Sequence, residues 1–158
     1  MRERWRSLKP SHFLRAASVV SALYAVGHTS GFPWAAPSGP ENDALVQSMQ
    51  GHRFHVMGAT RTVWDFHVGF GLIISADLLV QAALLWLLAS LSTRVGAAPL
   101  RPVVVTLALA ALTNAVLVSR YFFVVPLCMA LIISGCVVLA LVTASHQSSP
   151  LRSAQERL

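Results

Sequence analysis

The sequence predicts an all-α membrane protein, in which four transmembrane helices form a bundle with one sizeable outer connecting segment. Of its 158 residues, 55% are hydrophobic and only 11% are charged, whereas soluble domains contain about 25% charged residues. Four uncharged stretches can each supply most of the about 20 apolar residues of a spanning helix; they cover residues 16–40, 78–93, 102–119 and 121–151. These features exclude an ordinary soluble enzyme and a disordered chain.

The first predicted span covers about residues 13–32. A basic tail before an apolar run is also typical of a signal peptide. The best small-residue pair after this run, Ala35-Ala36, leaves the bulky Trp34 where a cleavage site needs a small residue. We therefore expect a retained helix.

Residues 33–62 form the predicted outer segment, because several prolines between residues 33 and 40 break the first helix. Asn42 or Asp43 can cap a short helix, which we expect to end near Gly58. An amphipathic helix of this kind lies on the membrane surface or over the mouth of a bundle. Its apolar side would carry Leu45, Val46, Met49 and Val56.

The second predicted span covers residues 63–91. It begins at Thr62-Val63-Trp64-Asp65, which has the spacing of a capping box. We therefore expect Asp65 to stabilise the first turn of this helix, where the helix dipole favours a negative charge.

The third and fourth predicted spans cover about residues 102–119 and 122–143. Only a tight turn around Arg120 and Tyr121 separates them, so we expect an antiparallel helical hairpin. The tail at residues 145–158 is polar, and we expect it to fray. The whole chain is thus a single membrane domain.

The basic residues predict the orientation in the membrane. Both termini and the turn at residues 92–101 share one side and hold nine of the twelve Lys and Arg residues, whereas the other side holds Arg53, Arg61 and Arg120. Because positive residues accumulate on the cytoplasmic side, we expect both termini in the cytoplasm and the spans in the inner (cytoplasmic) membrane. These flanking positions also explain the net charge of +6, so nucleic acid is not an expected partner.

Asp77 is the most unusual residue of the predicted spans, because a charged side chain inside a membrane needs a partner or a purpose. On a helix, His67, Phe70, Ile74, Asp77 and Gln81 occupy one face of about 80°, and we expect this face to point into the bundle. One interpretation is a hydrogen-bonded network that holds the helices together. The other is a binding site in which Asp77 contacts a ligand.

Four histidines are expected on the outer side: His28, His52, His55 and His67. The pair His52 and His55, together with Asp65, fits a metal site, because neutral imidazole is a good transition-metal ligand. A haem held between His28 and His67 is a further alternative. Interfacial histidines are also common as half-exposed amphipathic side chains without any ligand, and the sequence predicts no definite cofactor.

Two polar residues of the third span are further candidates. Arg120 could hold an anionic lipid or substrate, pair with Asp65, or extend to the headgroups. Asn114, about 9 Å deeper along the helix, is expected to hydrogen-bond another helix. Cys128 and Cys136 lie about 12 Å apart along the fourth span, which is too far for a disulfide.

Residues 57–71 carry Met-Gly at the start and then Arg-Thr-Val-Trp-Asp-Phe-His-Val-Gly-Phe-Gly from Arg61 to Gly71, and Gly27-His28 lies upstream. This pattern resembles small four-helix bacterial integral membrane proteins that have no established function. The resemblance covers about residues 16–143. It implies the four-helix fold and implies neither a reaction nor a ligand.

For function, we expect the bundle to bind a small apolar molecule or a lipid. A hydrophobic cavity with a few converging polar groups is the usual form of a ligand site. The candidate binding residues are His28, His67, Asp77, Gln81, Asn114 and Arg120.

Two other classes of function stay open at this point. The chain could be a membrane oxidoreductase or a lipid-modifying enzyme that uses the outer histidines and Asp65, although the sequence identifies no catalytic residue. It could also be a subunit or assembly factor of a membrane complex, or a homo-oligomer, in which the polar groups only join helices. Membrane lipids are the expected partners in every case.

Overall fold

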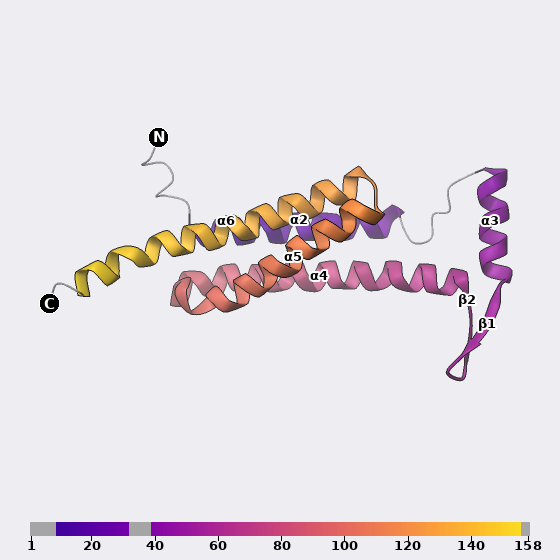
Figure 1. The fold of residues 1–158 in the computed structure, drawn as a ribbon, viewed down its shortest axis with the longest axis horizontal. Coiled ribbons are helices and arrows are strands. Elements are labelled where there is room, and N and C mark those ends of the chain that lie inside the picture. Colours follow the sequence, from indigo (N-terminus) through magenta and orange to yellow (C-terminus); the bar gives the residue numbers. More distant parts are fainter. Residues whose placement is uncertain (1–8, 32–38, 156–158) are drawn as a thin grey trace. The chain divides into compact units, whose positions relative to one another are not determined.

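The computed structural model describes residues 9–31 and 39–155, with side chains as far as residue 145. The proline-rich stretch with Trp34 and Ala35-Ala36, and the basic tail at residues 1–8, lie outside the described residues. The elements (Figure 1) are, in chain order, α2 (Pro10–Gly31), α3 (Pro40–Gly51), β1 (Arg53–Val56), β2 (Ala59–Thr62), α4 (Val63–Val95), η1 (Ala98–Leu100), α5 (Arg101–Tyr121) and α6 (Val124–Gln155).

The chain is mostly helical, and three of its helices are long and apolar enough to cross a membrane. These are Val63–Val95, Ala98–Tyr121 and Val124–Ser145. The prediction of helices that are long and apolar enough to cross a membrane is therefore confirmed for the second, third and fourth spans. It is not confirmed for the first, α2, which has 22 residues but is not among these three. Serine, threonine and histidine side chains lower the hydropathy of α2.

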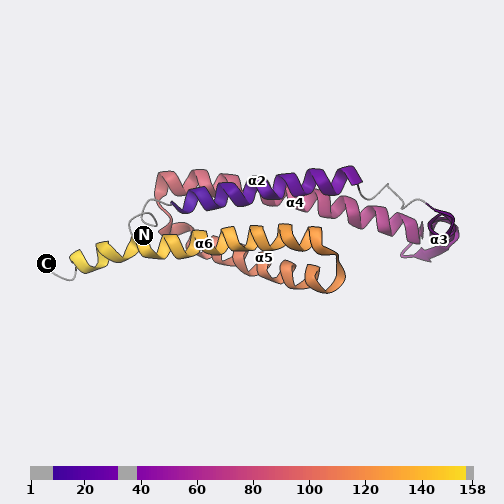
Figure 2. The same cartoon turned by 90° about the horizontal axis from the view of Figure 1, so that it is seen from above.

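The structure divides into two compact units, residues 1–22 with 80–158 and residues 23–79. Both α2 and α4 contribute to each unit. In the first unit, α5 and α6 lie side by side as the predicted antiparallel hairpin (Figures 1 and 2). Their contact is built from small and β-branched residues, which let the two helices approach closely: Ala115, Val118 and Ala130 are buried, with Leu127 packed against them.

In the same unit, the first half of α2 packs along the second half of α4. Ser18 donates a hydrogen bond from Oγ to the carbonyl of Ala82 (2.7 Å), and Gln81 donates from Nε2 to Ser21 Oγ (2.9 Å). The buried residues along both segments are mostly small, which permits this close approach; they include Leu14, Ala17, Ser21, Ala82, Leu85 and Ala89.

The second unit contains a two-stranded antiparallel hairpin, which was not predicted from the sequence. Its register pairs Arg53 with Thr62 and Val56 with Ala59. The prediction that the short outer helix continues to Gly58 is wrong, because α3 ends at Gly51 and strands follow. Aromatic and β-branched residues alternate in the strands, and such residues favour extended backbone.

The hairpin turn consists of Met57 and Gly58, both with positive φ (50° and 82°). This is the backbone of the two-residue turns that connect hairpin strands. Figures 1 and 2 show that α3 and the hairpin run across the axis of α4 at its N-terminal end.

Candidate functional site

The start of α4 is held by the predicted capping box. The backbone N–H of Thr62 donates to Asp65 Oδ2 (2.8 Å), and the N–H of Asp65 donates to Thr62 Oγ1 (3.1 Å). These two bonds satisfy N–H groups that have no partner inside the helix. They also place the last residues of β2 directly beside the first turn of α4, so that Arg61 and Asp65 lie at the same end of the helix.

An open groove begins at this end of α4. It has a volume of about 270 Å³ and is lined by Arg61, Asp65, Phe66, Gly69, Phe70 and Ile73. Residues 66, 69, 70 and 73 share one side of the helix, because their spacing follows the helical repeat of 3.6 residues. The groove therefore has an apolar floor along α4 and two charged side chains at its outer end.

Aromatic contacts support one end of this floor. The ring of Phe54 in β1 stacks on Phe66 with centroids 5.3 Å apart, and Phe66 lies 6.1 Å from Phe70. Phe70 is nevertheless 61% exposed. At Gly69, an added Cβ would meet no atom within 4 Å, so the centre of the floor is open space.

The hairpin brings a positive charge to the outer end of the groove. Arg61 pairs with Phe54 across the hairpin, so both side chains lie on the same face of the two strands. The Nη1 group of Arg61 donates to the carbonyl of Thr60 (2.9 Å), which leaves its other donors for a ligand. Together with the carboxylate of Asp65, Arg61 gives the groove a polar outer end above an apolar floor, which is an arrangement that suits an amphiphile.

Among the predicted binding residues, His28 joins α2 to α4 in the second unit. Its Nδ1 lies 3.1 Å from Ser75 Oγ, and Thr29 donates from Oγ1 to the same oxygen (2.9 Å). His28 also makes an edge contact with Tyr24. His67 has a different neighbour, the indole of Trp64, on which it stacks at 5.2 Å. These contacts give each histidine a structural partner of its own.

The expectation that Asp77 points into the interior is not met among the described residues, although His67, Ile74 and Gln81 of the same predicted face are half-buried. Asp77 and Phe70 are exposed. The buried face of α4 lies about one residue further round the helix, and consists of Gly71, Ser75, Leu78, Ala82, Leu85 and Ala89. Small side chains determine which face of α4 is buried, because they allow the neighbouring helix to approach closely. Gln81 lies at the edge of the face and bonds Ser21, as expected for a residue that joins helices.

Asn114 and Arg120 lie on α5 in the first unit, and both are exposed. The expectation that Asn114 points toward another helix is therefore not met in the described part of the chain. Arg120 lies in the last turn of α5, just before the extended residue Phe122 that ends the helix. An exposed arginine at a helix end can extend to lipid headgroups.

The residues of the expected metal site have other contacts. His55 Nδ1 lies 3.1 Å from Thr60 Oγ1 across the hairpin, His52 follows the end of α3, and Asp65 belongs to the capping box. In the described part of the chain, no group of three or more His, Cys, Asp or Glu side chains could hold a metal ion.

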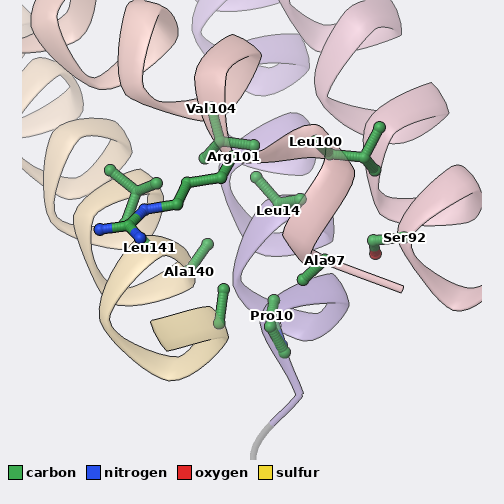
Figure 3. Close-up of a pocket in the computed structure, with 10 residues that line it drawn as sticks. Pro10, Leu14, Ser92, Ala97, Leu100, Arg101, Val104, Ala140 and Leu141 are labelled. Carbon is green, nitrogen blue, oxygen red and sulfur yellow. The ribbon is translucent and has the colours of Figure 1, made fainter. Parts of the chain in front are cut away.

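A second cavity, in the first unit, is too small for a ligand. It has a volume of about 10 Å³, which is about the space of one water molecule. Figure 3 shows its lining, with Arg101 of α5 extended beside Leu141 of α6 and Leu14 of α2 nearby. Its walls are almost entirely apolar, so it is a packing defect between helix ends.

The groove at the start of α4 is therefore the best candidate site, although its floor was not predicted from the sequence. A signal was present, since Phe66, Phe70 and Ile73 repeat at helical spacing directly after Arg61. The chain matches no protein-family model, no curated protein and no solved structure.

Proposed function

We propose that the chain is a multi-pass membrane protein that binds a lipid or another small apolar molecule in the groove at the start of α4. The observation that carries this proposal is the open apolar floor of Phe66, Gly69, Phe70 and Ile73 with Arg61 at its outer end. Ligand sites have volumes of about 300–1,000 Å³. A groove of about 270 Å³ thus suits one segment of a lipid or a small apolar molecule.

The position of the groove along α4 supports a ligand that enters from the membrane. Helix α4 has 33 residues and is about 50 Å long at 1.5 Å per residue, whereas the hydrocarbon core is about 30 Å thick. If the C-terminal end of α4 lies at one interface, its first turns reach the opposite headgroup region. Ile73 would then lie where the acyl chains meet the headgroups, and Arg61 at the outer edge of the headgroup region or beyond it.

The proposed topology has four spans, with α2 as the first. The polar side chains of α2 that reduce its hydropathy are bonded by α4: Ser18, Ser21, His28 and Thr29 each have a partner there. A helix with satisfied polar groups can lie in a membrane. The distribution of arginines favours both termini on the cytoplasmic side of the inner membrane.

The decisive experiment fills the groove. In Gly69→Leu, the added side chain occupies the open floor without a clash inside the chain, so the variant should fold. The matched control is Gly135→Leu on α6, where an added Cβ also meets nothing within 4 Å. We expect a defined lipid or apolar molecule, identified by mass spectrometry, to co-purify with the parent and the control but not with Gly69→Leu.

Equal amounts of that molecule in both variants would contradict the proposal, and so would a parent that carries only bulk phospholipid. Arg61→Gln then distinguishes the ligand classes. Loss of the molecule indicates an anionic end bound by Arg61, and retention indicates an uncharged apolar molecule. Arg120→Gln removes an exposed arginine outside the groove and serves as its control.

Asp77 favours a second candidate function, a subunit of a membrane complex. Its side chain is exposed among apolar neighbours on α4 and has no hydrogen-bond or ion-pair partner among the described residues. A carboxyl group at membrane depth is costly without a partner, and a donor on another membrane helix would supply one. Photo-crosslinking from Val80, one turn away and exposed, should capture a membrane protein in the parent. Crosslinks to lipid alone would exclude this role.

A further inference from the structure

The tip of the β1–β2 hairpin displays two apolar side chains that the fold does not use. Met57 is fully exposed (102%), and its neighbour Val56 is also exposed. Met57 has φ +50°, a left-handed backbone that is unfavourable for residues other than glycine, asparagine and aspartate. Such turns ordinarily carry Asn-Gly or Asp-Gly. A methionine at this position neither relieves the backbone nor packs against the protein, which points to a contact outside the chain.

We propose that this hairpin tip inserts into the phospholipid surface beside α4 and anchors the outer segment there. This inference goes beyond the ligand groove, and requires only that α4 crosses the membrane. The binding partner of the tip is thus a lipid surface.

The chain connectivity keeps the tip near the membrane interface. Strand β2 ends at Thr62 and α4 begins at Val63, so four residues separate the turn from the helix. Four residues of extended strand span about 13 Å. The hairpin also runs across the axis of α4 (Figures 1 and 2), which means that it lies along the membrane plane when α4 spans the membrane.

The charges of the hairpin complement phospholipid headgroups. Residues 52–62 include Arg53, Arg61 and two histidines and contain no acidic residue. Apolar side chains next to basic residues are typical of segments that lie in the membrane interface. Each basic residue there is also attracted by anionic lipid headgroups.

The size of the tip argues against a protein partner. A stable protein interface buries about 800 Å² on each partner, which two side chains at a turn do not provide. Shallow insertion of a methionine and a valine into a membrane needs no such area, because each buried apolar group contributes independently.

The test is the depth of a spin label at Met57 in vesicles of equal parts phosphatidylcholine and phosphatidylglycerol. The full chain carries Met57→Cys, with Cys128 and Cys136 replaced by alanine. Collision rates with oxygen, which concentrates in lipid, are compared with those of a water-soluble nickel chelate. Labels at Gln47→Cys on the exposed side of α3 and at Leu79→Cys on the apolar surface of α4 supply the aqueous and the lipid references.

We expect the ratio of oxygen to nickel collisions at Met57 to be several-fold higher than at Gln47 and lower than at Leu79, because the tip inserts only to a shallow depth. A ratio equal to that at Gln47 would place the tip in water and overturn the inference. A label at Met57 that is immobilised and reached by neither reagent would overturn it as well, because it would show a protein contact. Since the Met57 side chain packs against nothing, the substitution itself should not unfold the chain.

Discussion

The contact between α2 and α4 differs in chemistry from the contact between α5 and α6. Helix α2 is joined to α4 by side-chain hydrogen bonds in both units, through Ser18 and Ser21 in one and through Ser75 in the other. The α5–α6 contact is built from buried alanine and valine. A nearby buried hydroxyl, Ser134 Oγ, donates to the carbonyl of Ala130 on its own helix (2.7 Å).

This difference explains why mean hydropathy identifies α5 and α6, but not α2, as helices apolar enough to cross a membrane. Lipid is as apolar as leucine, so apolar helices such as α5 and α6 are stable in a membrane before they meet, and then associate by close packing. A helix with several polar groups is costly in hydrocarbon until a neighbour bonds them. In a membrane, α2 would therefore depend on α4 to bond its polar side chains.

The largest expected effect is an all-or-none difference in cysteine labelling. It tests whether α2 spans the membrane. In a chain without native cysteines, Lys9→Cys and Gln47→Cys flank α2 at exposed positions. We expect a membrane-impermeant maleimide to label the two positions from opposite sides of sealed vesicles. Labelling of both from the same side would show that α2 lies on one surface, and the comparison of two membrane-embedded helix pairs would fail.

The next largest effect is expected for Ser75→Leu. Ser75 is 7% exposed, and a larger side chain there would separate α2 from α4 and remove their hydrogen bonds. Overpacking of a buried position costs about 1–3 kcal/mol. The free energy of unfolding, measured by circular dichroism during titration of detergent micelles with dodecyl sulfate, should fall by at least this amount. Gly135→Leu adds the same side chain where there is room, and should leave the stability unchanged.

Smaller effects on the free energy of unfolding are expected for Ser75→Ala and Ser134→Ala. These two variants directly compare the α2–α4 and α5–α6 contacts. Ser75 accepts a bond from the other helix, so its loss should cost about 1 kcal/mol. Ser134 is also buried (3% exposed) but bonds its own helix, so removal of its hydroxyl should cost clearly less. Similar losses for both in the same titration would show that hydrogen bonds do not distinguish the two contacts.

The smallest effect is expected for Gln81→Leu, which removes the bond to Ser21 at the edge of the α2–α4 contact. Hydrogen bonds between membrane helices contribute about 0.6 kcal/mol on average. We expect a loss of this size in the free energy of unfolding, and a similar loss for Ser21→Ala. The double variant should lose no more than one of the single variants, because both substitutions remove the same bond. Additive losses would show that the two residues act separately.

Part of the candidate site could be predicted from the sequence. The spacing of Thr62 and Asp65 predicts the capping box that starts α4, and both of its hydrogen bonds are present. Local spacing was sufficient here because the four residues are consecutive, at the junction of β2 and α4. The groove beside it was missed, because its floor depends on which side of α4 the neighbouring helix leaves uncovered.

The sequence by itself determined that the chain is helical and apolar enough for a membrane, since these properties follow from composition and from the helical repeat. It also predicted the antiparallel α5–α6 hairpin, because a short turn between two long helices favours antiparallel packing. The tertiary structure alone decided that residues 53–62 form a hairpin and that Asp77 is exposed. The physical reason is that a hydrogen-bonded strand pair and a helix–helix contact both depend on a partner segment. Ser75 and Ala82 of α4 accept hydrogen bonds from side chains of α2. This contact sets the rotation of α4, which leaves Asp77 exposed.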